Sequence, residues 1–245
     1  MKLLAADSQP HRTPWGDTSA VAILASETLT KHHEHYAAAK SGDIAAGMAM
    51  VRDLINRRGV KRKIGMLIKR RDPLIVPVHA VESNSVNVIP TALAETLYGD
   101  FDLRVNYDIL QANRVSHTGS DGYHRLATPP LFAGDVIRGE NYLIIDDFVG
   151  QGQYPGSHRG ERRQCHWYGV ADGQKRSATI AVTVNTLKAL RAKHETLEDW
   201  WREVFGYGFE LLTESEARYL LNSPDVDNIR TRIAEIAREG DRRPG

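Results

Sequence analysis

The chain has 245 residues, of which 41% are hydrophobic and 26% are charged, and its formal net charge is +1. These values are typical of a soluble globular protein that is long enough for one well-buried domain with appendages, or for two domains. Because the net charge is close to zero, the composition gives no reason to expect a nucleic-acid partner or an anionic membrane.

Cys165 is the only cysteine, which excludes an internal disulfide and a cluster of thiolates for zinc. The apolar run at the start of the sequence is too short for a signal peptide, and no stretch is long enough to span a membrane. We therefore expect a cytoplasmic protein without a membrane partner.

Residues 1–18 contain two prolines and several polar residues, which predicts an irregular arm. His32, His33 and His35 flank Glu34, a grouping that could hold a metal ion. No further ligand lies at a suitable spacing, so the start of a surface helix is the favoured interpretation.

A helix is expected over residues 44–56, because apolar side chains recur there at helical spacing and Asp43 stands where an N-cap residue is favoured. The cationic residues before Gly59 and the glycine itself are typical of a helix C-terminus.

Residues 73–80 are the first strong strand candidate, and their apolar run favours a parallel strand. Pro77 lacks an N–H donor, which favours a bulge or a sheet edge at that point. A helix is expected over residues 89–97, with Pro90 in its first turn, and an alternating strand over residues 103–110. Strand, loop and helix together form one βα unit.

The segment from Gln111 to Pro130 has little apolar periodicity, and it combines cationic residues with glycines. A long unstructured connection inside a compact domain is commonly functional, so we interpret it as a lid that closes over an anionic ligand. The alternative is an exposed loop without a role.

The last part of the chain predicts a short strand followed by helices. Trp200 and Trp201 are expected to be packing residues, and Thr213 with Glu216 forms a capping-box pattern. The expected elements are a strand over 177–182 and helices over 184–193, 197–205, 217–221 and 224–238.

The most informative stretch begins at Tyr142, where four residues of low polarity run into Asp146 and Asp147. A glycine loop, Gly150-Gln151-Gly152, follows directly. Such a run predicts a buried strand of a parallel sheet, and charges at its end lie at the carboxyl edge, where open α/β folds bind ligands. Carboxylates for hydroxyl groups or a metal, followed by amides for a phosphate, indicate a site for a phosphorylated sugar.

This motif resembles the phosphoribosyl pyrophosphate (PRPP) binding motif of the type I phosphoribosyltransferases (PRTases). The resemblance implies an α/β fold with a mostly parallel sheet flanked by helices, and a helical C-terminal extension. It divides the chain into N-terminal arm and hood elements over 1–40, a PRTase-like core over 41–195 and the extension over 196–245.

Carried over by position, the resemblance gives each part of the motif a role. Asp146 and Asp147 would face the ribose hydroxyls, directly or through Mg²⁺, and Gly150, Gln151 and Gly152 would present amides to the 5-phosphate. The candidates for the pyrophosphate loop and the lid are His79, Ala80, Glu82, Arg114, His117 and Arg125.

The implied activity is that of a glycosyltransferase, in which a nitrogen nucleophile such as a nucleobase displaces pyrophosphate from PRPP with Mg²⁺ as cofactor. The implied setting is nucleotide metabolism, and the implied assembly is a homodimer. Two alternatives stay open. One is a PRPP-sensing or nucleotide-sensing regulator on the same fold with little catalysis. The other is a metal-dependent phosphate hydrolase, although further carboxylates for that chemistry are not evident.

The sequence departs from the family after Gly152. The family continues with glycine and threonine, whereas this chain has Gln153, Tyr154 and Pro155. The codons for this stretch can restore a threonine when read one base later, so we put forward the hypothesis that residues 153–176 are frame-shifted. The alternative is a genuine, divergent loop for a different ligand, and sequencing the gene would decide.

Overall fold

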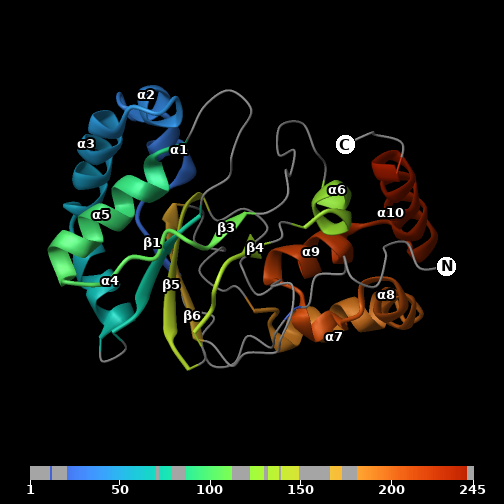
Figure 1. The fold of residues 1–245 in the computed structure, drawn as a ribbon. Coiled ribbons are helices and arrows are strands. Elements are labelled where there is room, and N and C mark those ends of the chain that lie inside the picture. Colours follow the sequence, from blue (N-terminus) through green and yellow to red (C-terminus); the bar gives the residue numbers. More distant parts are fainter. Residues whose placement is uncertain are drawn as a thin grey trace.

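The computed structural model describes residues 12, 21–69, 72–78, 87–111, 122–129, 132–137, 139–148, 166–172 and 181–241. Their elements form two groups that lie side by side (Figure 1). We call the group around the strands the sheet half, and the group of helices formed by residues 122–129 and 181–241 the helical half. Within the described residues no helix is both long and apolar enough to cross a membrane.

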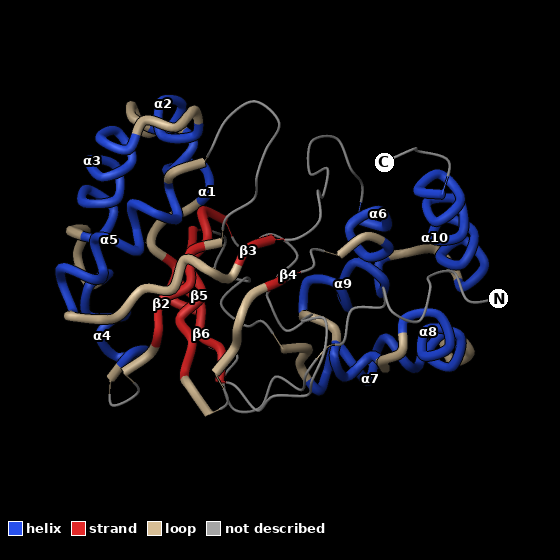
Figure 2. The backbone as a smooth tube through the Cα atoms, viewed as in Figure 1, coloured by secondary structure: helices blue, strands red, loops and turns tan. Residues whose placement is uncertain are grey.

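The sheet half is built on four strands in the order β1 (Val21–Ile23), β6 (His166–Asp172), β5 (Asn141–Phe148) and β2 (Leu74–Pro77), and all three pairings are parallel (Figure 2). β5 is an inner strand, and each residue from Tyr142 to Ile145 is at most 2% exposed. The predicted buried parallel strand is therefore confirmed. A strand with neighbours on both sides and helices over it has no solvated face, which explains why its sequence is apolar throughout.

β2 confirms the strand expected over residues 73–80 and ends at Pro77. On its outer side Ile75 exchanges backbone hydrogen bonds of 2.8 Å with residues 104 and 106. The strand expected over 103–110 is reduced to this single bridge and to β3 (Leu110–Gln111), which pairs antiparallel with β4 (Phe132–Ala133). Alternation alone was too weak a signal here, because strand formation also needs a partner along the whole length.

Five helices belong to the sheet half: α1 (Glu27–Lys31), α2 (Tyr36–Lys40), α3 (Ile44–Ile55), α4 (Val60–Ile68) and α5 (Ile89–Phe101). α3 begins as expected, since the Asp43 carboxylate accepts the Ala46 N–H at 3.0 Å. Gly59 (φ +82°) makes the turn into α4, a backbone conformation that favours glycine.

The two faces of the sheet are covered differently. Side chains alternate across a strand, so Ile75 and Leu143 point to one face while Val76 and Tyr142 point to the other. The first face packs against α3, α4 and α5, and the second against the segment around β3 and β4. Both layers are apolar, which fixes the register of β2 and β5.

The helical half consists of α6 (Gly122–Ala127), α7 (Val184–Lys193), α8 (Leu197–Phe205), the 3₁₀ turn η3 (Phe209–Leu211), α9 (Glu214–Asn222) and α10 (Val226–Asp241). The helices expected in the last part of the chain are confirmed, and so are the capping box of Thr213 and Glu216 and the burial of Trp201. The ring of Trp201 lies 4.3 Å from that of Phe205, centroid to centroid, at the centre of this core.

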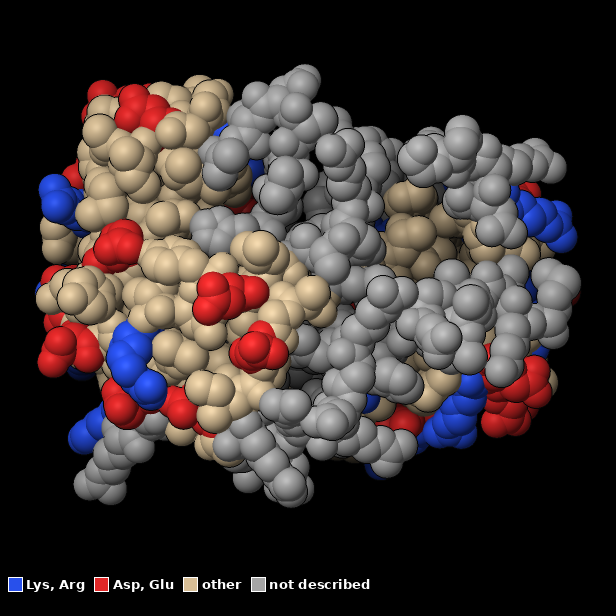
Figure 3. All heavy atoms as spheres, in the orientation of Figure 1, with Lys and Arg blue, Asp and Glu red and all other residues tan. Residues whose placement is uncertain are grey.

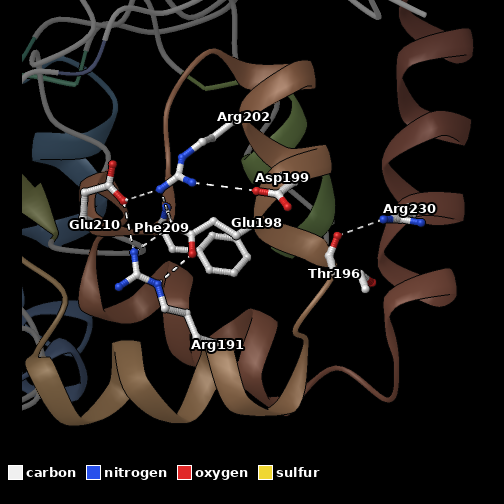
Figure 4. A network of polar contacts seen from close by, with 8 residues as sticks. All are labelled: Arg191, Thr196, Glu198, Asp199, Arg202, Phe209, Glu210 and Arg230. Carbon is white, nitrogen blue, oxygen red and sulfur yellow. Dashed lines mark hydrogen bonds and ion pairs between the residues drawn. The ribbon is translucent and has the colours of Figure 1, made fainter.

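The carboxylates of the helical half are matched by arginines (Figure 4). Glu198 accepts hydrogen bonds from Arg191 at 2.7 and 2.8 Å, from Arg202 at 2.9 Å and from the Phe209 N–H at 3.1 Å. Glu210 lies 3.4 Å from both arginines. The hydrogen bond from Arg191 is the main reason why the pKa of Glu198 is below its usual value.

Arg12 ties the N-terminal region to the helical half. Its guanidinium forms two hydrogen bonds with the Glu216 carboxylate, at 2.5 and 2.6 Å, and a third with the Leu211 carbonyl at 3.1 Å. It also lies over the Tyr207 ring, 4.7 Å from the centroid. The Glu216 side chain is fully buried, so this is a desolvated pair with two parallel hydrogen bonds.

Two elements differ from the sequence interpretation. α6 forms inside the predicted lid of residues 111–130, because Tyr123, Leu126 and Ala127 are buried against the helical half. β6 forms inside residues 153–176 and takes an inner position in the sheet. Both were missed because each depends on a surface supplied by distant parts of the chain. The frame-shift hypothesis itself stays a prediction.

The α/β class, the parallel sheet and the helical C-terminal part are therefore present. The packing also places α6 and α7 with the C-terminal helices rather than on the sheet. The domain bounds at residues 40 and 195 stay a prediction.

Candidate functional site

Asp146 and Asp147 lie at the carboxyl end of β5, directly after the buried run that ends at Ile145. The paired strand β2 runs parallel to β5 and ends level with Ile145. In open parallel sheets this edge is where ligands bind, because the loops that leave the strands can converge there. The predicted location of the two carboxylates is thus the one the fold makes available for a site.

Two side chains from other elements meet at Asp147. Lys40, the last residue of α2, donates to Asp147 Oδ2 at 2.9 Å, and the Asn87 amide donates to the same oxygen at 2.9 Å. The Lys40 side chain is 31% exposed and that of Asp147 is 13% exposed. The pair is therefore reachable from solvent at Lys40 and largely shielded at Asp147.

Asn87 is held in place by the helix that follows it. Its side-chain oxygen accepts the Ile89 N–H at 3.2 Å, so that the amide group is directed toward Asp147. The sequence signalled the helix start, because Pro90 in the first turn is typical of one, but not the contact of Asn87 with Asp147. Nothing in the sequence around Lys40 indicated that it reaches the carboxylates.

Asp146 has an unusual protonation equilibrium. Burial raises its pKa well above the usual value, and the neighbouring charge of Asp147 raises it further. The Asp147 N–H donates to Asp146 Oδ1 at 2.8 Å and acts in the opposite direction, as does the more distant charge of Lys40. Because Asp146 interacts this directly with the Asp147 carboxyl group, the two do not ionise independently, and the first proton is held by the pair.

Tyr36 of α2 belongs to the same electrostatic environment. Burial is the main cause that raises the pKa of its phenol, Asp147 raises it further, and Lys40 lowers it. The site thus gathers a carboxylate pair, an ammonium group, an amide and a phenol from three segments of the chain, namely α2, Asn87 and the end of β5. Such a set can donate to and accept from a polar ligand at several points.

Most of the other predicted site residues lie outside the described residues, namely His79, Ala80, Glu82, Arg114, His117, Gly150, Gln151 and Gly152. Their predicted roles are not tested. Arg125 is described, and it lies on α6, which packs against α9 and α10 in the helical half. The structure therefore brings Asp146 and Asp147 together with Lys40 and Asn87, but it does not bring Arg125 to them.

Asp146 and Asp147 supply oxygen donors of the kind that a magnesium ion takes, but in the part of the chain that the structure describes only two such residues lie together here. Mg²⁺ commonly binds proteins through one or two carboxylates and keeps several of its waters. The described residues hold no group of three or more His, Cys, Asp or Glu side chains that could bind a metal ion. Asp146 and Asp147 would be the ligands, and Lys40 already neutralises one oxygen of Asp147.

The chain is similar to two curated proteins. It is 35% identical to Protein TraN of Escherichia coli over 243 residues, which cover 97% of this chain and 54% of TraN. It is 33% identical to an uncharacterized protein of Haemophilus influenzae over 155 residues, which cover 63% of this chain and 34% of that protein. The chain thus spans about half the length of TraN and about a third of the Haemophilus protein. No protein-family model and no solved structure matches it.

These comparisons overturn the resemblance to the type I PRTases. TraN matches nearly the whole chain and the Haemophilus protein matches 63% of it, whereas no protein-family model, and so no PRTase model, matches. The inferred transfer of phosphoribose from PRPP, the PRPP-sensing alternative and the placement in nucleotide metabolism were therefore wrong. The physical reason is that many buried parallel strands end in an apolar run, acidic residues and a glycine loop. Such a short motif is therefore not specific to one family.

Proposed function

We propose that the carboxyl edge of the parallel sheet binds a small polar ligand, with Asp147, Asn87 and Lys40 as the groups that contact it. The observation that supports this most is the convergence of a cation and an amide on one oxygen of a shielded carboxylate pair. A pair that served stability alone would be expected to lower the pKa of its carboxylates, whereas here the pKa of Asp146 is raised.

The two carboxyl groups would have different roles. Asp146 retains a proton to higher pH than an ordinary aspartate, and it can therefore donate a hydrogen bond or a proton. Asp147 accepts a hydrogen bond from the Lys40 ammonium group and can likewise accept from a ligand hydroxyl or amine. This division suits acid–base chemistry on a hydroxyl-bearing or amine-bearing ligand, so an enzymatic role is part of the proposal.

Mg²⁺ is the cofactor that we propose for this site. A divalent cation beside Asp146 and Asp147 would relieve the repulsion between the two carboxylates and would lower the pKa of Asp146. It would bind at the carboxylate oxygens that do not face Lys40, or it would displace Lys40. Both outcomes predict that Mg²⁺ binding weakens as the pH falls, because the proton on the pair competes with the metal.

We further infer that the matching part of TraN has the same two-part fold and the same sheet edge. The identity of 35% over nearly the whole of this chain supports that inference. Formation of a homodimer and a location in the cytoplasm stay predictions.

The test combines titration with ligand screening. The carboxyl carbons of Asp146 and Asp147 would be followed by NMR as a function of pH, with and without Mg²⁺. Thermal shift and calorimetry would then be used to screen hydroxylated and amine-bearing small molecules against the unmutated protein and Asp147→Asn. Asp227→Asn is a matched control, because Asp227 is an exposed aspartate on α10.

We expect a carboxyl group that titrates above the usual aspartate range, a shift of that titration to lower pH with Mg²⁺, and ligand binding that Asp147→Asn abolishes and Asp227→Asn retains. Ordinary titration of both carboxyl groups, together with no difference between Asp147→Asn and Asp227→Asn in the ligand screen, would show that the edge is not a binding site.

A further inference from the structure

A second surface of the sheet half has an excess of positive charge, whereas the chain as a whole is nearly neutral. From residue 56 to residue 69, which covers the turn after α3, all of α4 and its C-cap, the sequence has six Lys or Arg residues and no Asp or Glu. The chain as a whole has 32 basic and 31 acidic residues, so this local excess is strong. We call these fourteen positions the basic corner.

The fold turns the charges of the basic corner outward. Val60, Ile64 and Leu67 of α4 are buried in the core of the sheet half, and this anchors one side of the helix. The opposite side is therefore exposed, and every basic residue of the corner is on it or in the adjoining turn. The exposed basic residues are Arg57, Arg58, Lys61, Arg62, Lys63 and Lys69.

Within the part of the chain that the structure describes, most of these charges have no acidic neighbour in contact with them. Lys61 forms an ion pair of 3.0 Å with Asp100 and lies 5.8 Å from the centre of the Phe101 ring. The other five form no ion pair or side-chain hydrogen bond with another residue in the described parts of the chain. The arginines of the helical half are the contrast, because Arg191 and Arg202 are both engaged with Glu198 and Glu210.

The basic corner is separate from the carboxylate pair. α3 begins next to α2, whose last residue Lys40 contacts Asp147, and it runs away from that edge to the turn before α4. Figure 1 accordingly shows α4 at the end of the sheet half opposite to α1 and α2. In Figure 3 both basic and acidic side chains are seen at the lower left of the molecule, the part where Figure 1 draws α4.

We propose that the basic corner binds the phosphate backbone of double-stranded DNA. At a rise of about 1.5 Å per residue, α4 and its flanking residues extend over roughly 15–20 Å. A duplex presents one negative charge per about 1.7 Å of its axis, so several phosphates lie within that length. Arginine and lysine side chains are the donors that proteins most often use to contact phosphate oxygens.

Features of the corner favour this partner over other anionic surfaces. Single-stranded nucleic acid is bound by stacking bases on aromatic rings, and none of these fourteen positions is aromatic. A helix that binds a membrane inserts its apolar face, whereas the apolar face of α4 is already buried in the protein and Met66 is the only large apolar side chain it exposes. The binding is independent of sequence, because it rests on the backbone of the duplex.

The test is the binding of a short fluorescent DNA duplex of mixed sequence to the full chain, measured by anisotropy over a series of salt concentrations. The variant is Arg62→Ala with Lys63→Ala, which preserves helix formation because alanine favours it. The control is Lys188→Ala with Arg238→Ala, which removes the same charge from exposed positions on α7 and α10. Circular dichroism of each protein checks the fold.

We expect the unmutated protein to bind with a dissociation constant of about 10⁻⁴ to 10⁻⁶ M at moderate salt, as is typical of backbone binding. The variant should bind roughly tenfold more weakly, and its slope of log affinity against log salt should be smaller by about 2, while the control keeps affinity and slope. Three results would overturn the proposal: no binding of the duplex at low salt, equal loss in variant and control, or tighter binding of RNA duplex, single strands or phosphatidylserine vesicles.

Discussion

Glu198 in the helical half and Asp146 in the sheet half are held in opposite ways. In the helical half, Glu198 is surrounded by donors from Arg191, Arg202 and the backbone, and its pKa is lowered. At the edge of the sheet, Asp146 stands beside another carboxylate, and its pKa is raised. The first arrangement stabilises the fold at neutral pH, and the second costs stability there. An arrangement that lowers the stability of the fold is commonly retained where function requires it. For this reason the sheet edge is our candidate site.

The largest expected effect comes from Glu216→Ala. It removes the partner of Arg12 and one half of the capping box with Thr213, and it leaves a guanidinium buried without its counter-charge. Loss of one member of a buried ion pair costs about 3–5 kcal/mol. Urea unfolding would measure the change. Glu235→Ala breaks an exposed pair with Arg232 and should change stability by less than about 1 kcal/mol, so equal effects of the two changes would contradict the burial of the Arg12 contact.

Glu198→Gln should have an intermediate effect of about 1–3 kcal/mol at neutral pH, because it weakens charge-assisted hydrogen bonds to two arginines. Since the pKa of Glu198 is lowered in the folded protein, its contribution is present above the usual carboxyl pKa and is lost as the pH falls through the folded-state pKa. The difference between the two proteins should therefore shrink below about pH 4.5, the unperturbed value. A difference that is independent of pH in acid would contradict the charged state of Glu198.

The smallest expected effect has the opposite sign. Asp146→Asn replaces a carboxyl group that favours its neutral form with a neutral group of the same shape, and it should raise stability at neutral pH by on the order of 1 kcal/mol. Because the pKa of Asp146 is raised, the unmutated protein loses stability as the pH rises above the usual aspartate value, and the two proteins should converge in acid. Thermal unfolding at several pH values would measure this. Destabilisation by Asp146→Asn at neutral pH would show that the two halves do not differ as described.

The sequence predicted the elements whose signals are local. The apolar run from Tyr142 to Ile145, the Asp43 cap of α3 and the capping box of Thr213 each depend on residues within one or two turns or a single strand, and all three are confirmed. The position of Asp146 and Asp147 at the end of a buried parallel strand followed from the same kind of signal.

Contacts and elements that depend on distant parts of the chain were not predicted from the sequence. Lys40 and Asn87 contact Asp147 across 107 and 60 residues of sequence, and no pattern around either residue records that contact. α6 was missed because its apolar side chains are buried by packing against the rest of the helical half, which is distant in the sequence. The PRTase resemblance failed for a related reason: it rested on a short local motif, whereas family membership is a property of the chain as a whole.

The contact of Arg12 with Glu216 spans 204 residues, and β1 pairs with β6, which lies in the second half of the chain. Synthesis proceeds from the N-terminus, so β1 and Arg12 have no partner until the chain has been made as far as β6 and Glu216 respectively. Contacts between such distant positions close large loops at an entropic cost and are typical of slow steps in folding. We therefore expect the docking of Arg12 to be among the last events in folding, and the nascent chain to keep the apolar edge of the sheet uncovered until β6 arrives.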